Sequence, residues 1–253
     1  MSARFEAERP ETYRDTLRRL ASAQKGHARG APAYSVYINR RLGRLLAAGA
    51  YRAGLTPNQV SLVSAAHTFT GIALIASVPP SWWLGVLVGV LLALGYAWDS
   101  ADGQVARLRG GGSISGEWLD HFLDAIKLAT LHVAVVIGLA RFTDVEGSLL
   151  LIPLAYSVVS TVTFFGMILN DLLKSARGVP SSATRGGGTF GRSFLLVPTD
   201  YGALCIVFLL WGWTTGFLVV YAVLLVVNAA FLCVAAAKWF REMAATDRRP
   251  AGP

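Results

Sequence analysis

The sequence predicts an all-α integral membrane protein, a bundle of six transmembrane helices with an N-terminal interfacial amphipathic helix. Of its 253 residues, 54% are hydrophobic and only 15% are charged, whereas a soluble domain usually carries about a quarter charged residues. The mean hydropathy is +0.50. The chain is nevertheless basic, with 23 lysines and arginines against 15 aspartates and glutamates. This combination excludes a disordered or fibrous protein, argues against an ordinary soluble enzyme and indicates a membrane protein with cationic ends.

The N-terminal part is expected to lie outside the bilayer core. Residues 1–32 are polar and lack the apolar stretch of a cleavable signal peptide. In residues 33–54, Tyr34, Ile38 and Leu42 recur at helical spacing, which predicts an amphipathic helix on an anionic leaflet. The alternative is a solvated helix on a cytoplasmic cap.

Six apolar stretches are each about long enough to cross a bilayer core, which takes roughly 20 helical residues. They are expected at residues 60–78, 82–98, 122–140, 148–170, 194–213 and 217–237. Proline, glycine or polar segments separate them. The two cysteines, Cys205 and Cys233, fall inside these stretches and are interpreted as small core residues. The chain is thus expected to divide into a polar cytoplasmic segment, a membrane domain and a cytoplasmic tail, at residues 1–32, 33–243 and 244–253.

The basic residues predict an orientation in the membrane. All but two of the 23 lysines and arginines lie before the first stretch, after the sixth, or in the second and fourth loops. The exceptions are Arg141, on the other side, and Lys127, inside the third stretch. Cytoplasmic loops of membrane proteins carry an excess of basic residues. We therefore expect a protein of the cytoplasmic membrane with both termini on the cytoplasmic side.

A cluster of acidic residues lies where the second stretch ends and the third begins. Its members are Asp99, Asp102, Glu117, Asp120 and Asp124. Ionised groups near hydrocarbon are costly and usually face a cavity or a partner, so this cluster is the candidate functional site. Separations of three and four residues put each aspartate pair on one helix face, and antiparallel helices would bring the two faces together. Four such carboxylates would repel unless cations neutralised them, and all-oxygen ligands suit Mg²⁺ or Mn²⁺.

Small and basic residues accompany the cluster. Gly103 and Gly116 allow a helix or a phosphate to approach closely, and the glycines at 110–112 allow a tight turn. Arg107, one helical turn beyond Gly103, can contact a phosphate or a carboxylate. The alternative is that these residues only cap helix ends in interfacial salt bridges. So many acidic, glycine and basic residues in one short segment favour a functional site over helix capping alone.

The same residues resemble the signature of the CDP-alcohol phosphotransferase family, D-x2-D-G-x2-A-R-x8-G-x3-D-x3-D. Every fixed position is present, at Asp99, Asp102, Gly103, Ala106, Arg107, Gly116, Asp120 and Asp124. The preceding Leu-Thr-Pro-Asn at 55–58 resembles the family's TPN-type segment, and the spans resemble its fold from about 34 to 241. The resemblance implies transfer of a substituted phosphate from a CDP-linked donor to an alcohol, with release of CMP. It also suggests a homodimer.

The resemblance implies a role for each matching residue. Asp99, Asp102 and Asp120 would ligate a pair of Mg²⁺ or Mn²⁺ ions, and Asp124 would be the general base and share a metal. The CDP pocket would be lined by Thr56, Asn58, Gly103, Arg107 and Gly116. Ser113 is added only because its hydroxyl follows the glycine turn.

The residues that would bind the acceptor are less clearly marked. Lys127, about one turn after Asp124, could bind a phosphate or compensate the aspartate charges. Arg177, Arg185 and Arg192 could bind an anionic acceptor such as glycerol phosphate or inositol phosphate, or only orient the chain. Both interpretations stay open for each residue.

The reaction we expect is metal-dependent transfer of a phosphatidyl group from CDP-diacylglycerol to an alcohol, in phospholipid biosynthesis. The apolar bundle suits a lipid donor whose acyl chains stay in the bilayer. The expected partners are CDP-diacylglycerol or another CDP-alcohol, the alcohol acceptor, membrane lipids and a second copy of the chain, without nucleic acid. One alternative transfers a CDP-linked headgroup to a lipid alcohol. Another is a divalent-cation channel or transporter, although carboxylates gathered at one interface favour nucleotide chemistry.

Overall fold

A computed structural model describes residues 12–22, 31–179 and 189–247, and these residues form helices joined by turns. The α-helices are α1 (Tyr13–Ser22), α2 (Arg40–Arg52), α3 (Pro57–Ser77), α4 (Trp82–Leu108), α5 (Ile114–Phe142), α6 (Leu151–Ala176), α7 (Phe190–Leu195), α8 (Tyr201–Val207) and α9 (Thr214–Asp247). Short helical turns are η1 (Ser35–Asn39), η2 (Gly147–Leu150), η4 (Val197–Thr199) and η5 (Phe208–Leu210). The predicted all-α architecture is confirmed for the described part of the chain.

Five of these helices are long and apolar enough to cross a membrane: α3, α4, α5, α6 together with η2, and α9. Hydroxyl side chains cap the start of α3, α4 and α5. Thr56 Oγ1 accepts from Gln59 N at 3.3 Å, Ser81 Oγ from Leu84 N at 3.1 Å and Ser113 Oγ from Gly116 N at 3.0 Å. The helix α4 continues ten residues past the expected end of its apolar stretch, to Leu108. This extension carries the first part of the acidic cluster.

The stretch expected as the fifth span, 194–213, is not one continuous helix. It is divided into α7, η4, α8 and η5, and its apolar helical part, Tyr201–Leu210, is shorter than a membrane span. Pro198 cannot donate a backbone hydrogen bond, and Asp200 caps a new helix by accepting from Gly202 N at 3.0 Å. The expected count of six spans is therefore not confirmed.

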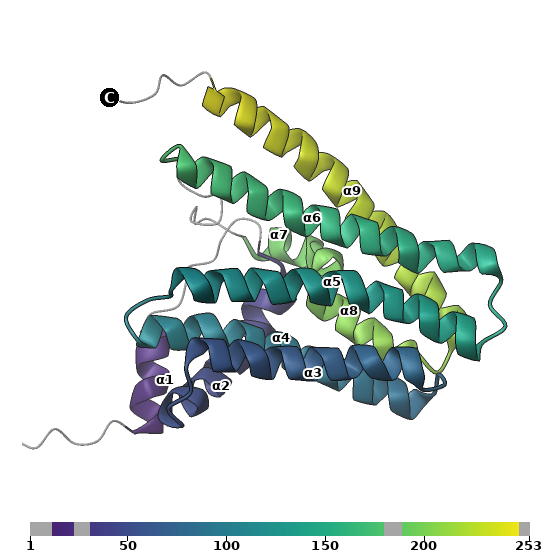
Figure 1. Cartoon of the computed structure of the whole chain (residues 1–253), viewed down its shortest axis with the longest axis horizontal. Helices are drawn as coiled ribbons and strands as arrows, with labels where there is room; N and C mark the ends of the chain where they lie inside the picture. Colours follow the sequence, from purple (N-terminus) through teal and green to yellow (C-terminus); the bar gives the residue numbers. More distant parts are fainter. Residues whose placement is uncertain (1–11, 23–30, 180–188, 248–253) are drawn as a thin grey trace, which may run out of the picture.

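The core lies between α3, α4, α5, α8 and α9. Ile75, Leu92, Leu131, Phe208 and Tyr221 are among its fully buried side chains. The helices α3 and α4 approach closely because Gly95 has no side chain, and an added Cβ would lie 2.1 Å from Thr68 Oγ1. Along the chain, α4, α5 and α6 each reverse the direction of the membrane-length helix before them. The helix α9 runs in the same direction as α6, because the segment from α7 to η5 returns the chain to the other end of the bundle (Figure 1).

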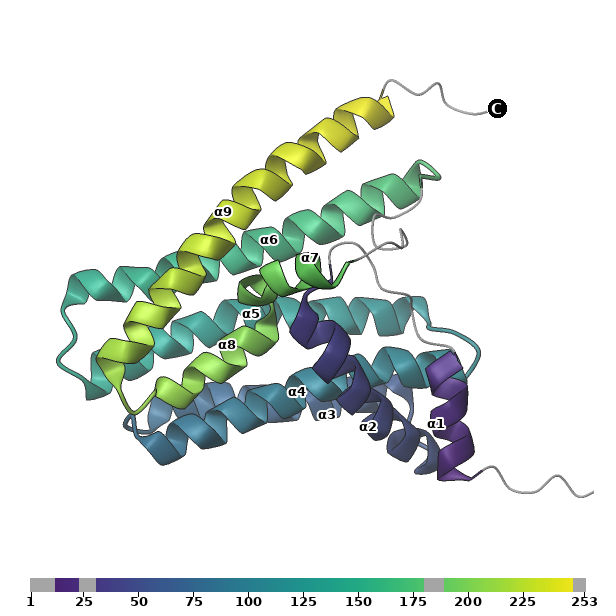
Figure 2. The ribbon, with the colours of Figure 1, turned by 180° about the vertical axis from the view of Figure 1, so that it is seen from behind.

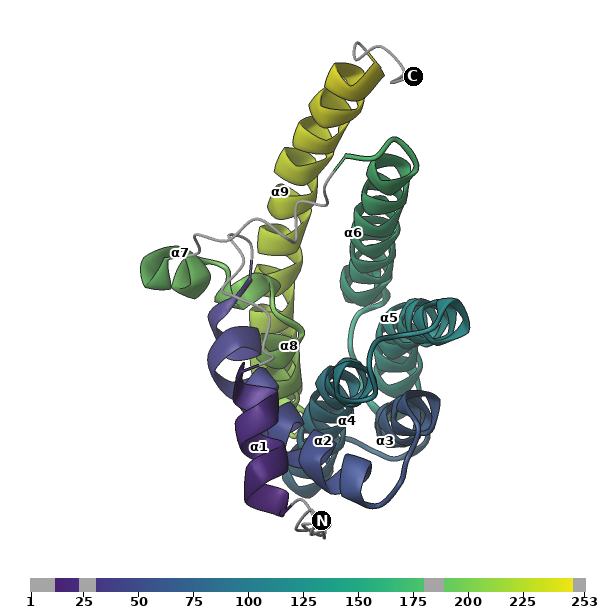
Figure 3. The ribbon, with the colours of Figure 1, turned by 90° about the vertical axis from the view of Figure 1, so that its left-hand side faces the viewer.

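The helices α6 and α9 stand apart from this core for part of their length. Towards the end of the bundle where α9 finishes, both helices rise away from α4 and α5 (Figure 3). They stay in contact with each other there, since Lys174 Nζ of α6 donates to Glu242 Oε2 of α9. Leu154, Val158, Val162 and Phe165 of α6 are exposed. An exposed apolar face of this kind is expected where a helix contacts lipid or another protein.

The connections between the membrane-length helices lie at the two ends of the bundle. The α4–α5 loop, the end of α6 and the end of α9 lie at one end, and the connections at 78–81, 143–146 and 211–213 lie at the other (Figures 1 and 2). The first end also carries the acidic cluster and, among the described basic residues, Arg107 and Arg109 at the end of α4 and Lys174 and Arg177 at the end of α6 (Figure 1). That this end is cytoplasmic stays a prediction.

The N-terminal region contains more helix than its polar sequence indicated. Within 1–32, the helix α1 buries Leu20 in a small cluster with Ala47 and Ala101, and the rest of that range lies largely outside the described residues. The expected helix at 33–54 is present as η1 and α2, and α2 crosses α4 (Figure 2). Gly43 permits this contact, since an added Cβ would lie 2.8 Å from Ser100 Cβ. That the helix at 33–54 is amphipathic and lies in the membrane interface stays a prediction.

Candidate functional site

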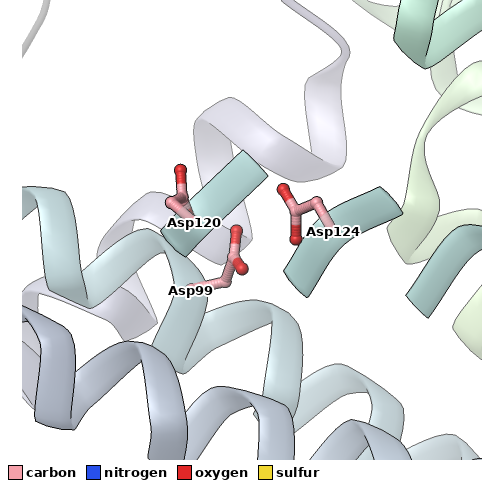
Figure 4. Close-up of side chains that lie close together, drawn as sticks. All are labelled: Asp99, Asp120 and Asp124. Carbon is pink, nitrogen blue, oxygen red and sulfur yellow. The ribbon is translucent and has the colours of Figure 1, made fainter. Parts of the chain in front are cut away.

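Three carboxylates meet where α4 lies against α5. Asp99 projects from α4, and Asp120 and Asp124 project from successive turns of α5, so that the three side chains lie close together (Figure 4). One carboxylate oxygen from each lies within 4.8 Å of the other two. All three side chains are half-buried. The spacing therefore does bring the two acidic faces together.

Asp102 lies next to this group without being part of it. Its side chain is buried, and its Oδ2 accepts a hydrogen bond from Ser61 Oγ of α3 at 2.6 Å. Its Oδ1 accepts from the backbone N–H of Gly103. The sequence indicated four converging carboxylates, whereas the structure brings three together and ties the fourth to a neighbouring helix.

Lys127 supplies the positive charge of the cluster. Its Nζ donates to Asp99 Oδ1 at 2.7 Å, to Asp124 Oδ1 at 3.0 Å and to Ser64 Oγ at 3.1 Å. An ammonium group has three hydrogens to donate, and here each has an acceptor. Of the two interpretations left open for Lys127, the structure favours compensation of the aspartate charges over binding of a phosphate.

The donor set fits a divalent cation. The carboxylates present several oxygens within the reach of one ion, and oxygen ligands are those that Mg²⁺ and Mn²⁺ prefer. Four aspartates against one buried ammonium leave an excess of negative charge near the membrane, which a bound cation would remove.

Gly103 and Arg107 form an open face beside the carboxylates, whereas Gly116 is closely packed. An added Cβ at Gly103 would meet only Arg107 Nη1, at 3.7 Å, so nothing else packs there among the described residues. Arg107 is half-buried, and its Nε has no hydrogen-bond partner in the described part of the chain. At Gly116, an added Cβ would lie 3.1 Å from Asn58 Oδ1, so this glycine lets the start of α3 approach α5.

Two residues predicted to bind the donor have structural roles. Thr56 Oγ1 accepts from Gln59 N at 3.3 Å while Gln59 Oε1 accepts from Thr56 N at 2.9 Å, which is a capping box at the start of α3. Ser113 caps α5 through its bond from Gly116 N. The turn before it needs glycine, because Gly110 and Gly111 have φ of +94° and +136°. Donor binding by Thr56 and Ser113 stays a prediction.

The arginines predicted for the acceptor lie away from the carboxylates or are not described. Arg177 is exposed at the end of α6. Arg185 and the side chain of Arg192 lie outside the described residues. Asp200, which lines the interior of the bundle, accepts from Ser35 N at 2.7 Å, Tyr96 Oη at 3.2 Å and Gly202 N at 3.0 Å.

A cavity of about 390 Å³ opens beside Asp99, Asp124 and Lys127 and extends between α5, α6, α8 and α9. The polar residues that line this cavity were not predicted from the sequence. They include Tyr156, Ser160, Thr163, Tyr201 and Asn228. The signal was present on α6, because residues 156, 160 and 163 repeat at helical spacing within an apolar stretch.

The chain resembles known proteins over most of its length. A family model described as CDP-alcohol phosphatidyltransferase matches residues 54–237. The phosphatidylinositol phosphate synthase of Corynebacterium glutamicum is 34% identical over 150 residues, 58% of this chain and 62% of that protein. The archaetidylinositol phosphate synthase of Pyrococcus horikoshii is 32% identical over 98 residues, 39% of this chain and 47% of that protein. The matched part thus spans less than two thirds of these relatives.

A solved structure has a similar fold. The phosphatidylinositol phosphate synthase of Mycobacterium tuberculosis with CDP-DAG bound superposes with a TM-score of 0.54 at 22% identity, covering 78% of this chain and 90% of that one. At this level of identity, the likeness concerns the arrangement of helices and not the substrates.

Proposed function

Because the chain belongs to the CDP-alcohol phosphatidyltransferase family, we propose that it transfers a phosphatidyl group from CDP-diacylglycerol to the hydroxyl of an alcohol, with release of CMP. The observation that carries this proposal is the position of Asp124. Its carboxylate belongs to the group formed with Asp99 and Asp120, and it also lines the cavity. A donor phosphate at the carboxylates and an acceptor in the cavity would therefore meet at this residue.

The donor would enter from the membrane. Two relatives are named as synthases of inositol-phosphate lipids, and the similar solved structure has CDP-DAG bound. The acyl chains would stay among the apolar side chains that α6 and α9 expose, while the diphosphate reaches the carboxylates. The nucleotide would be received by the open face at Gly103 and by Arg107, whose Nε has no partner among the described residues, together with Asn58, Gly116, Thr56 and Ser113.

Asp124 would act as the general base. The acceptor hydroxyl loses its proton to the Asp124 carboxylate as its oxygen attacks the phosphorus that carries diacylglycerol. A new phosphorus–oxygen bond forms, the bond to the bridging oxygen of CMP breaks, and CMP leaves with that electron pair. General-base catalysis of this kind contributes typically 10²–10⁴-fold to a rate.

Asp99, Asp102, Asp120 and Asp124 would hold two Mg²⁺ or Mn²⁺ ions. When bound, such ions neutralise diphosphate charge and stabilise the leaving phosphate. Ser61 would orient Asp102 through its 2.6 Å hydrogen bond, and Lys127 would hold Asp99 and Asp124 in place. These two are positioning residues, since each acts on a carboxylate and not on the substrate.

The active site and both termini would face the cytoplasm, and the protein would be a homodimer of the cytoplasmic membrane. The sidedness rests on the basic residues gathered at the end of the bundle that carries the site. The apolar face of α6, exposed at Val158 and Phe165, is compatible with a partner subunit or with lipid. The 33–243 membrane domain would contain all of the catalytic residues.

The proposal is tested with purified protein in liposomes that contain CDP-diacylglycerol and Mg²⁺. Addition of an alcohol should produce CMP and a phosphatidyl-alcohol in equal amounts. A parallel reaction with a CDP-linked headgroup and diacylglycerol tests the reverse arrangement, in which the lipid is the acceptor. Failure of every alcohol to raise CMP release above its basal rate would refute the proposed transfer.

A further inference from the structure

The cavity beside Asp124 continues well into the bundle. It is lined at one end by Asp99, Asp124 and Lys127 and elsewhere by side chains of α5, α6, α8 and α9, including His132. Asp124 and His132 are eight residues apart on α5, which corresponds to about 12 Å along a helix axis. A volume of about 390 Å³ lies within the usual range of roughly 300–1,000 Å³ for small-molecule sites. The cavity can therefore hold an acceptor whose far end lies one or two turns from the general base.

One wall of the cavity presents hydrogen-bond acceptors. Ser160 Oγ donates to Ser157 O at 3.2 Å, and Thr163 Oγ1 donates to Val159 O at 2.6 Å. Each hydroxyl has a single hydrogen, and in these bonds that hydrogen is directed at the helix backbone. The remaining lone pairs of the two hydroxyls are available to accept from a ligand. Such a wall suits a ligand that donates hydrogen bonds, as an alcohol does.

The far end of the cavity contains a buried nitrogen atom that has no partner in the described part of the chain. His132 is fully buried, its Nδ1 contacts the Tyr221 hydroxyl, and its Nε2 has no partner among the described residues. Its ring stacks on Tyr156, with ring centroids 4.3 Å apart. The Tyr156 hydroxyl accepts from Asn228 Nδ2 at 3.0 Å, which leaves its own hydrogen free to donate. A buried unpaired nitrogen is costly, and a ligand hydroxyl would satisfy it.

The charges of the described part of the lining do not suit an anion. Lys127 is the cation that the described lining contains, and its three hydrogens are already directed at Asp99, Asp124 and Ser64. Asp200 adds a further carboxylate to the wall. A phosphate group offers only acceptors and needs donors or cations to replace its hydration. Near Asp124 it would instead meet the carboxylates of Asp99, Asp124 and Asp200, and the Ser160 and Thr163 hydroxyls have their hydrogens engaged.

We infer that the acceptor is an uncharged alcohol with several hydroxyl groups, one held at Asp124 and the others at Thr163, Tyr156 and His132. This inference rests on the transfer reaction proposed above and names the class of its acceptor. It differs from a phosphorylated acceptor, the kind that the names of the relatives suggest. The apolar side chains of Leu128, Leu204 and Phe231 complete the lining, against which the carbon framework of the alcohol would pack.

The first test compares matched acceptors in CDP-diacylglycerol liposomes with Mg²⁺. Inositol is paired with inositol phosphate and glycerol with glycerol 3-phosphate, and CMP release is measured over a range of acceptor concentrations. We expect at least one uncharged member to have a kcat/KM more than tenfold above that of its phosphorylated partner. Preference for the phosphorylated member in both pairs overturns the inference but leaves the transfer reaction standing. Absence of acceptor-dependent CMP release in all four reactions refutes the reaction itself, and the inference with it.

The second test uses two variants with a matched control. Thr163→Val removes a hydroxyl that lines the cavity and donates to its own helix backbone. Thr70→Val is the control: it removes a hydroxyl of α3 that also donates to its own helix, to Ala66 O at 2.7 Å, but that lies outside the lining. Thr163→Val should raise the KM for the uncharged acceptor about three- to tenfold, the effect of one neutral hydrogen bond, without changing the KM for CDP-diacylglycerol. Thr70→Val should change neither constant.

His132→Phe keeps the ring that stacks on Tyr156 and removes both nitrogens. It should raise the KM for the acceptor by a similar factor. If this variant does not fold, Thr163→Val still decides the question. An acceptor KM within twofold of the unmodified protein in Thr163→Val overturns the assigned site.

Discussion

The ammonium group of Lys127 on α5 lies 2.7 Å from Oδ1 of Asp99 on α4, so one buried cation links the two helices that carry the acidic cluster. The same nitrogen lies 3.0 Å from Asp124 Oδ1. Because the aspartates would otherwise repel one another, Lys127 allows the cluster to assemble before any divalent cation binds. Both bonds use Oδ1, so the Oδ2 atoms of Asp99 and Asp124 are not bonded to Lys127.

Removal of this charge should make stability depend on divalent cations. Lys127→Met leaves Asp99 and Asp124 close together without their cation, and breaking a buried pair in this way costs up to about 3 kcal/mol, because the carboxylates stay partly exposed. Thermal unfolding in detergent with a chelator should show a lower Tm than for the unmodified protein. Mg²⁺ should restore most of the loss.

Lys238→Met is the matched control, because Lys238 is mostly exposed and lies 3.6 Å from Glu242, far along α9 from the cluster. Its Tm should change little in either condition. If Lys127→Met lowers the Tm equally with and without Mg²⁺, Lys127 does not substitute for a bound cation.

Ser61→Ala tests the positioning of Asp102. The variant removes the 2.6 Å hydrogen bond that orients this carboxylate, and loss of such an outer partner typically weakens metal binding 10–100-fold. The Mg²⁺ concentration that gives half-maximal CMP release should therefore rise about tenfold. Ser77→Ala, which removes a hydroxyl bonded to its own helix at Ala73 O, should leave this concentration unchanged. An unaltered Mg²⁺ dependence in Ser61→Ala would remove Asp102 from the proposed ligand set.

Two glycines of α4 should respond differently to alanine. At Gly103 an added Cβ meets only Arg107 Nη1 at 3.7 Å, so Gly103→Ala should fold normally and raise the KM for CDP-diacylglycerol by narrowing the open face. At Gly95 an added Cβ would lie 2.1 Å from Thr68 Oγ1, so Gly95→Ala should lower stability by about 1–3 kcal/mol. Thermal unfolding and donor KM measured on both variants check this contrast. A destabilised Gly103→Ala with a normal donor KM would indicate a packing role for Gly103.

Much of the fold could be predicted because its signals are local. Hydrophobic stretches of membrane length indicate helices wherever they pack, and five of the expected spans are present. The fifth stretch, 194–213, has the right composition, but Pro198 and the capping carboxylate of Asp200 interrupt it. Hydropathy averaged over a window does not register one proline followed by a cap, and so the count of six was not confirmed.

The site was predicted less completely because it depends on how helices meet. The spacing of Asp99 and Asp102 puts both on one face of α4, but whether each carboxylate turns to α5 or to α3 depends on the register between helices. Asp102 turns to Ser61 of α3. His132 and Asn228 could not be linked from the sequence, since they lie on different helices and meet through Tyr156.

The most direct test of the account is CMP release from CDP-diacylglycerol by Asp124→Asn with Mg²⁺ and an acceptor alcohol. The substitution keeps the size of the side chain and removes its ability to take a proton, so CMP release should fall at least about 10²-fold while Tm stays near that of the unmodified protein. Asp144→Asn, an exposed change in the α5–α6 connection at the other end of the bundle, should keep full activity. Near-normal turnover by a folded Asp124→Asn would contradict the assignment of Asp124 as the general base.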